Sequence, residues 1–321
     1  MATFYSDLRF NINTLDFSTP LQVPHSISLL GGADFFVNLP KVQIGDVSYN
    51  VPAHDFAYQS GIKVMVSGTV SGEVLAGDDF AFDPEGILIS GTTTVLATLN
   101  QGFFNIGVAG FALSAVTLNT AAQSATTDDD RSLFATIFAG NDLITTGSFD
   151  DRFDGGAGKD LFYDFNGDDT LSGGDGDDLM TAGRGADRVN GDAGKDVILG
   201  GKGDDVILGG TGADVIWAGP GTDIVTGGAG ADVFLFKAGD GIATITDFKA
   251  GDQILFMGLQ SGLANLQMTK VGADLWISFS NLSIQLLDTQ LSDVPLTAVA
   301  TGGNAALVTA ADAFFAGWDY A

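Results

Sequence analysis

The hydrophobic and polar positions of residues 137–235 repeat every nine residues without a gap. Eleven units follow one another, and GGKGDDVIL (200–208) and GGTGADVIW (209–217) are clear copies. Position eight is a large apolar residue in every unit, and position six is Asp in every unit. The second half of each unit favours a short strand whose position-eight side chain points inward, whereas the glycine-rich first half favours turns with positive φ.

Strand and turn in regular succession predict a solenoid. Two units would form one coil of eighteen residues, so that turns stack on two edges and consecutive units lie on opposite edges. The eleven units give about 5.5 coils, or roughly 26 Å of stack at about 4.8 Å per layer. The predicted fold class is therefore all-β, a parallel β-roll with ends that must be capped.

The segments on either side of the roll are also rich in strand patterns. Residues 1–136 contain alternating runs such as IKVMVSG (62–68) and ILISGTTTVLATL (87–99), separated by glycine turns. They predict an N-terminal β-rich domain, either a sandwich or an irregular β-helix that continues into the roll. After a roll of residues 137–256, the runs 266–281 and 282–288 predict a hairpin that caps the stack within a C-terminal segment of 257–321.

Composition narrows the chemistry of the chain. The net charge is −27, and all of its 40 acidic residues except Glu73 and Glu85 are Asp. A compact fold with this charge repels itself unless cations neutralise it, and the chain has no basic patch for nucleic acid. It also lacks Cys, so no disulfides are expected. No run of eighteen apolar residues occurs, so no membrane span is expected.

The turns would bring Asp carboxylates and backbone carbonyls together at both edges. Six or so oxygen ligands in a flexible loop suit Ca²⁺ better than Mg²⁺, and two His without Cys argue against Zn²⁺. An alternative is a metal-free roll in which Asp closes Asx-turns, but that would also accept Asn or Ser at position six. Asp142 begins the series, and the predicted calcium-site residues are Asp151, Asp160, Asp169, Asp178, Asp187, Asp196, Asp205, Asp214, Asp223, Asp232, Gly155, Gly173, Gly191, Gly200, Gly209 and Gly227.

Copies such as GGAGADVFL (227–235) resemble the calcium-binding nonapeptide repeat of the RTX family. Residues 77–150, which lead into the first units, look like the leader segment of alphaproteobacterial RTX proteins. The run FKAGDGIATITDFKAGDQILFMG (236–258) is similar to the closing segment of RTX rolls. The resemblance implies a right-handed roll that folds on calcium outside the cell, and one more calcium site at Asp247 and Asp252, with Asp240 at a third acidic position.

The two ends of the chain bear on its localisation. The start, MATFYSDLRF, has neither the basic residues nor the apolar run of a secretory signal peptide. The end, VTAADAFFAGWDYA (308–321), resembles the C-terminal signal of type I secretion, although an ordinary amphipathic helix is the simpler alternative. The resemblance implies export by the type I secretion machinery to the medium or the cell surface.

Catalytic motifs such as GxSxG, HExxH and a Walker loop are absent from the sequence. His54 and the pair Asp78 and Asp79 could belong to a site, but solvated loops account for them more simply. The expected function is therefore non-enzymatic: a structural component that associates with itself into a surface layer, filament or matrix. The alternatives are an RTX adhesin, or a small enzyme that acts on polysaccharide or ester through residues 1–130.

Overall fold

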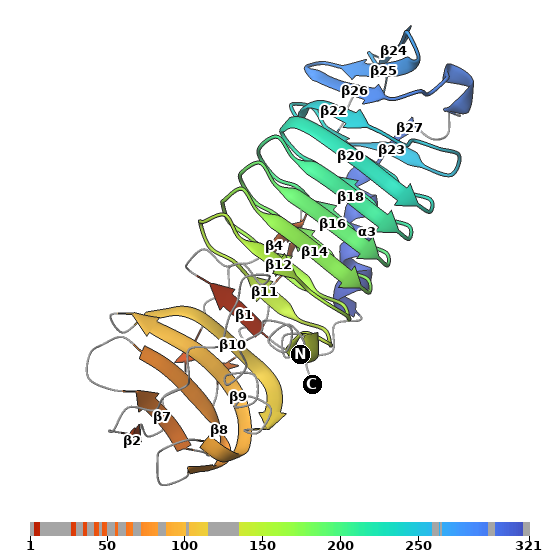
Figure 1. Ribbon diagram of the computed structural model, residues 1–321. Coiled ribbons are helices and arrows are strands. Elements are labelled where there is room, and N and C mark those ends of the chain that lie inside the picture. Colours follow the sequence, from red (N-terminus) through yellow and green to blue (C-terminus); the bar gives the residue numbers. More distant parts are fainter. Residues whose placement is uncertain are drawn as a thin grey trace.

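The protein is a long stack of short strands with an antiparallel sheet at its N-terminal end (Figure 1). The computed structural model describes residues 135–258, 263, 265–294 and 299–316, together with the backbone of the strands between Thr3 and Ser114. In this part of the chain, the strands form one sheet of fourteen, one of nine and two short pairs. No helix there is long and apolar enough to cross a membrane.

Each nine-residue unit supplies one strand, and consecutive units alternate between the two sheets. The fourteen-stranded sheet, here called the first sheet, contains β11 (Leu143–Thr145), β13 (Leu161–Tyr163), β15 (Leu179–Thr181), β17 (Val197–Leu199), β19 (Val215–Trp217), β21 (Val233–Lys237) and β23 (Gln253–Met257). The nine-stranded second sheet contains β12 (Arg152–Asp154), β14 (Thr170–Asp175), β16 (Arg188–Ala193), β18 (Val206–Thr211), β20 (Gly221–Ala229) and β22 (Gly241–Ile245). Ile144 pairs with Phe162 and Phe153 with Leu171, both in parallel register, which confirms the coil of eighteen residues.

The interior of the roll is a column of position-eight side chains from both sheets. None is more than 1 % exposed: Ile144, Phe153, Phe162, Leu171, Met180, Val189, Ile198, Ile207, Ile216, Val225 and Phe234. At the N-terminal end, the rings of Phe138 and Phe153 meet edge to face with centroids 5.1 Å apart. Burying each of the large side chains contributes about 1.5–3 kcal/mol, so the column is the main apolar support of the coils.

The outer face of the first sheet is covered by a helix, α3 (Gly303–Ala316). Leu307, Ala311 and Phe314 lie on one side of this helix and are buried against the sheet. They pack with the position-seven residues of the first-sheet units: Leu143, Leu161, Leu179, Val197, Val215 and Val233. The segment read as a secretion signal thus includes a docked helix, and residues 317–321 lie outside the described part.

Ten strands precede the roll in the described part of the chain. They are β1 (Thr3–Ser6), β2 (Ile27–Leu29), β3 (Phe35–Phe36), β4 (Val42–Ile44), β5 (Val47–Tyr49), β6 (Asp55–Phe56), β7 (Ile62–Val66), β8 (Gly72–Phe82), β9 (Leu88–Asn100) and β10 (Phe103–Ser114). Strands β7 to β10 pair antiparallel in chain order, so the β-helix alternative is wrong for them, because a β-helix needs parallel pairs. The expected continuity with the roll is present, since β1 pairs antiparallel with β10 and parallel with β11.

The far end of the roll is capped by three antiparallel strands, β24 (Gln267–Val271), β25 (Asp274–Phe279) and β26 (Leu282–Leu286). Strand β26 continues the second sheet by pairing in parallel with β22. A 3-10 turn, η2 (Leu291–Asp293), then leads to β27 (Val299–Thr301), which continues the first sheet beside β23. The predicted cap is present with one more strand than expected, and the domain boundaries at 136 and 256 stay predictions.

Candidate metal centre

The position-six Asp residues form two ladders, one on each edge of the roll. The first ladder contains Asp142, Asp160, Asp178, Asp196, Asp214 and Asp232 and ends at Asp252; the second contains Asp151, Asp169, Asp187, Asp205 and Asp223. In each step, Oδ1 of one Asp accepts a hydrogen bond from the backbone N–H of the preceding Asp, at 2.7 to 3.2 Å. One oxygen of each carboxylate therefore ties two coils together.

The second oxygen, Oδ2, has no such partner along most of both ladders. It is buried without a hydrogen bond in Asp160, Asp178, Asp187, Asp196, Asp205, Asp214 and Asp223, residues that are at most 1 % exposed. A buried ionised oxygen without a partner costs several kcal/mol unless a cation or a proton meets it. These oxygens are therefore the atoms that a bound cation would contact.

Burial raises the pKa of these carboxyl groups. The pKa of Asp160 rises to about 9, first because of burial and then because of the charges of Asp178 and Asp142. The same cause raises the pKa of Asp187 and Asp196 to about 8. Without metal, the folded roll would hold several of these groups protonated at neutral pH, whereas a divalent cation would reverse this preference.

In the units whose position one is glycine, this residue leaves space beside Oδ2 of the Asp at position six. A Cβ added to Gly155 would lie 2.5 Å from Oδ2 of Asp160 and 2.6 Å from the carbonyl oxygen of Gly173 in the next coil. The corresponding space at Gly191 is bounded by Oδ2 of Asp196 and the carbonyl of Gly209, both at 2.5 Å. Carboxylate and carbonyl oxygens thus converge where a side chain is missing, and such a donor set fits Ca²⁺.

One further carboxylate joins the second ladder. Asp164 stands at position one of its unit, and oxygen atoms of Asp151, Asp164 and Asp169 lie within 4.8 Å of one another, all three residues being buried. Burial, followed by the neighbouring Asp169, raises the pKa of Asp164 to about 10. The unit of residues 164–172 departs from the double glycine of the repeat, and Asp in place of glycine at position one was a signal of an additional ligand.

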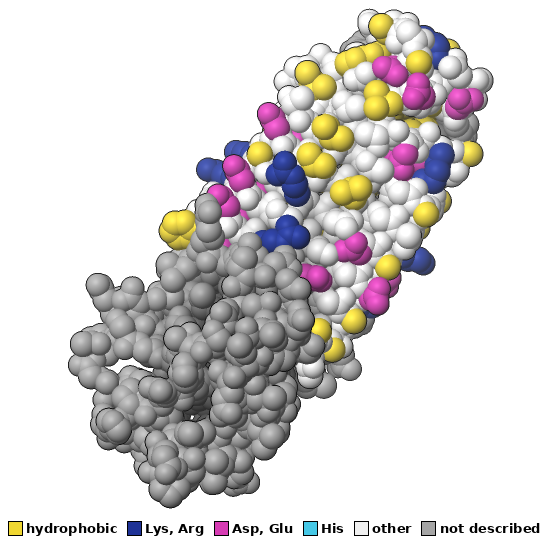
Figure 2. Space-filling model, viewed as in Figure 1, with side chains coloured by type: hydrophobic (Ala, Val, Ile, Leu, Met, Phe, Trp, Pro, Cys, Tyr) yellow, Lys and Arg dark blue, Asp and Glu magenta, His cyan; other side chains and the backbone are white. Residues whose placement is uncertain are grey.

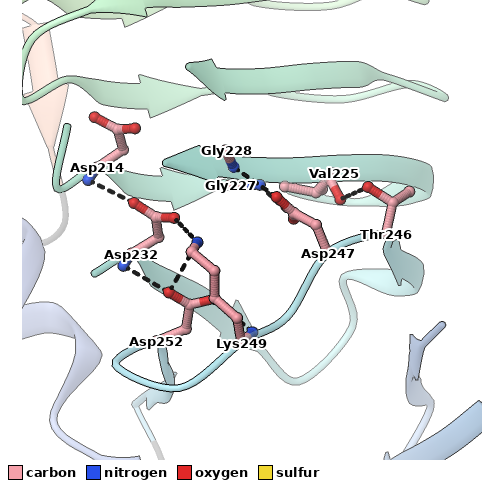
Figure 3. Close-up of polar contacts among 9 residues, drawn as sticks. All are labelled: Asp214, Val225, Gly227, Gly228, Asp232, Thr246, Asp247, Lys249 and Asp252. Atoms are coloured by element: carbon pink, nitrogen blue, oxygen red, sulfur yellow. Dashed lines mark hydrogen bonds and ion pairs between the residues drawn. The ribbon is translucent and has the colours of Figure 1, made fainter. Parts of the chain in front are cut away.

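The three acidic residues of the closing segment are engaged by the protein itself, and Figure 3 shows Asp247 and Asp252. Asp247 accepts hydrogen bonds from the N–H groups of Gly227 and Gly228 at 2.8 and 2.7 Å. Asp252 continues the first ladder and also contacts Lys249. Outside Figure 3, Asp240 accepts bonds from Trp217 and from the N–H of Lys237. As calcium ligands, Asp247 and Asp252 stay predictions, and the side chains of His54, Asp78 and Asp79 lie outside the described part.

The comparisons with known proteins agree with this geometry. The family model of the RTX calcium-binding nonapeptide repeat, HemolysinCabind, matches residues 137–163, 163–198 and 199–234. Together with the buried Asp residues, this match identifies Ca²⁺ as the ion that the repeats bind. None of the curated proteins compared with the chain matches it significantly.

One of the solved structures with a similarity to this chain is a lipase. The crystal structure of extracellular lipase LipA from Serratia marcescens is similar with a TM-score of 0.27 and 18% sequence identity. The likeness covers 51% of this chain and 39% of that chain, so this chain spans less than half of the lipase. A likeness at this level carries no argument about activity.

Proposed function

We propose, because residues 137–234 match the RTX calcium-binding nonapeptide repeat, that this chain is a secreted protein whose roll folds on extracellular Ca²⁺ and then associates with copies of itself. Bound calcium supplies the positive charge that the ladder carboxylates need when ionised. The protein's own oxygens, one carboxylate and one carbonyl at each position-one glycine, hold it between coils. The carrying observation is the row of buried Oδ2 atoms without partners.

Export before folding follows from the same charges. Without divalent cations the ladder carboxylates repel one another and the coils are unfavourable, so the chain would remain unfolded at the low calcium concentration of a cytosol. Extracellular calcium modules bind at about 10⁻⁴–10⁻³ M, which places the folding transition outside the cell. The C-terminal segment, whose helix α3 docks only on a formed roll, would be accessible to the type I machinery until then.

Self-association is supported by the outer face of the second sheet. Leu208, Ile224 and Ile242, on the neighbouring strands β18, β20 and β22, are 44 %, 47 % and 43 % exposed. Figure 2 shows apolar side chains on this face of the roll, which helix α3 does not cover. Among the described strands, β24 also ends the second sheet and pairs with β25 alone, which leaves an edge for another chain.

Light scattering and sedimentation after the addition of millimolar calcium to the full chain would test the assembly. We expect large particles, and we expect Ile224→Lys to reduce them because a charge would interrupt the apolar face. Thr170→Lys is the matched control, since Thr170 has the same strand position on the same sheet, away from the exposed apolar residues. A calcium-loaded protein that stays monomeric at high concentration would contradict the proposal.

A second candidate, an adhesin, is favoured by a groove of about 560 Å³ beside the first sheet. Aromatic residues Tyr163, Phe165 and Trp217 line it together with the exposed cations Arg184, Lys202 and Lys237. The indole N–H of Trp217 donates to Asp240 at 3.0 Å, which holds the ring in place. In a chain with a net charge of −27, three cations beside aromatic rings would suit a polysaccharide that carries carboxylates.

Retention on an immobilised polyuronate, with neutral dextran as the comparison, distinguishes the adhesin from the structural component. If the protein is an adhesin, the wild type should be retained in calcium and Trp217→Ala should abolish this retention. If its role is purely structural, the wild type should not be retained. A panel of glycan and ester substrates tests the enzyme hypothesis in the same preparation. Turnover of any of them would support the alternative of a small enzyme that acts through residues 1–130.

A further inference from the structure

The last members of the first ladder differ from the earlier members in the partner of Oδ2. In Asp160, Asp178, Asp196 and Asp214, Oδ2 is buried without a hydrogen bond. In Asp232, the next member, Oδ2 accepts a bond from Nζ of Lys249 at 3.1 Å. The same ammonium lies 3.4 Å from Oδ1 of Asp252, which is the last carboxylate of the ladder. A positive charge therefore already lies where the ladder makes its final step.

Hydrogen bonds and ion pairs hold Lys249 between these carboxylates (Figure 3). The side chains of Asp232 and Asp252 are 0% exposed, whereas that of Lys249 is 38% exposed, so its stem reaches inward from the surface. Its own N–H donates to Oδ2 of Asp252 at 2.9 Å, and its carbonyl accepts from the N–H of Asp252 at 3.1 Å. The turn of residues 249–252 thus closes on itself and aims the ammonium at Asp232.

The neighbouring part of the closing segment is also fastened by side chains instead of by another coil. Gly200 and Gly201 donate their N–H groups to backbone carbonyls of the next coil, at 3.0 and 2.9 Å. At the corresponding glycines, Gly227 and Gly228, the carboxylate of Asp247 takes over this task. The closing segment therefore replaces both the backbone partner and the positive charge that a further coil would bring.

We propose that the ammonium of Lys249 takes, in the interval between Asp232 and Asp252, the place that Ca²⁺ takes in the earlier intervals of the first ladder. The series of ions on this edge then ends one interval before the series of carboxylates. The closing end would be neutralised without metal and would form a folded base on which the calcium-dependent coils stack. This inference rests on calcium binding by the repeats and is independent of self-association.

The number of bound ions tests the proposal directly. Native mass spectrometry of the full chain in calcium should show one more ion bound to Lys249→Met than to the wild type, because the variant frees two buried carboxylates. Lys249→Arg keeps the positive charge and should keep the wild-type number. Lys159→Met is the control, since Lys159 forms its ion pair with Asp177 at 2.9 Å outside the ladders and its loss should not change the number.

Hydrogen exchange in EGTA supplies a readout that does not depend on bound metal. Residues 246–257 should be protected in the wild type and in Lys249→Arg, and should lose most of that protection in Lys249→Met. Equal ion numbers and equal protection in wild type and Lys249→Met would overturn the proposal. If Lys249→Met fails to fold in calcium, a crystal structure of the wild type grown in calcium decides. An ion between Asp232 and Asp252, with Lys249 displaced, would overturn the proposal; the ammonium in place, with ions only in the earlier intervals, would support it.

Discussion

At the scale of single residues, the two oxygens of each ladder carboxylate have different tasks. Oδ1 closes a hydrogen bond between coils, and Oδ2 provides charge in a space bounded by a carbonyl. An amide in place of the carboxylate would keep the first task and lose the second. Substitution by Asn therefore separates the structural contribution of position six from its contribution to calcium binding.

We expect Asp205→Asn to raise the calcium concentration at the folding midpoint by at least about tenfold, equivalent to about 1.4 kcal/mol. Circular dichroism during a calcium titration measures this midpoint. Asp204→Asn is the matched control, because Asp204 is exposed and its Oδ1 only accepts a bond from the N–H of Thr222 at 2.8 Å. Equal shifts in the two variants would show that the assignment of position six is wrong.

The turn glycines allow an equally local test of the distance between coils. Gly201 and Gly302 both have φ of +114°, so a side chain strains the backbone similarly at both. A Cβ at Gly201 would overlap the carbonyl oxygen of Gly183 in the preceding coil, whereas Gly302 has nothing within 4 Å of that position.

We expect Gly201→Ala to lower the free energy of unfolding in calcium by about 1–3 kcal/mol more than Gly302→Ala does. Denaturant unfolding at saturating calcium measures the difference. Equal losses would mean that the coils separate to accept a methyl group, and hence that their stacking is looser than the structure shows.

Much of the metal centre could be predicted from the sequence, because position six holds one residue type through eleven units. The Asp ladders, the inward column and the spacing of eighteen residues follow from that regularity. Asp164 and Lys249 were missed because each departs from the repeat, and their meaning appears only when the neighbouring coil is placed beside them. Lys249 in particular meets Asp232 across a step of 20 residues between Asp232 and Asp252, which no nine-residue period indicates.

At the scale of elements, the two sheets differ more than the repeat suggests. Position seven is Leu or Val in every nine-residue unit of the first sheet, whereas the second sheet begins with Arg152, Thr170 and Arg188 at this position. The first sheet therefore has an apolar outer face, and helix α3 covers it. This alternation between odd and even units was visible in the sequence, but the repeat itself does not indicate which segment covers the apolar face.

The contact of helix α3 should contribute measurably to stability. We expect Leu307→Ala to lower the free energy of unfolding in calcium by about 2–5 kcal/mol, the usual cost of removing a buried leucine side chain. Thr309→Ala, an exposed position of the same helix, should change it by less than about 0.5 kcal/mol. A small effect of Leu307→Ala on denaturant unfolding would indicate that the helix leaves the sheet in solution.

At the scale of the whole molecule, buried carboxylates make the metal-free protein sensitive to pH. The pKa of Asp205 and Asp214 in the fold is about 6 and that of Asp160 about 9, all above the ordinary 3.8 because of burial. Between the ordinary pKa of 3.8 and these raised pKa values, the folded chain binds more protons than the unfolded chain. Its stability is therefore greatest below about pH 3.8 and is lost as the pH rises through about 6 to 9.

We thus expect calcium-stripped protein to retain more β structure at about pH 4.5 than at pH 8, with the loss following these pKa values. Far-ultraviolet circular dichroism across the range measures it. Asp177, whose pKa Lys159 lowers, acts in the opposite direction but is one group against many. In calcium the order should reverse, since protons compete with the ion for the same oxygens. A metal-free signal that grows with pH would contradict the expectation.

The alternation of sheets also restricts how such a chain can change in length. Removing residues 200–217 would delete one coil and leave every later unit in its own sheet, with its apolar position seven still beneath helix α3. Removing residues 209–217 would transfer all later units to the opposite sheet, so that Ile224 would face the helix and Val233 would not. Duplications and losses that preserve the fold should therefore occur in multiples of eighteen residues, although the visible repeat in the sequence is nine.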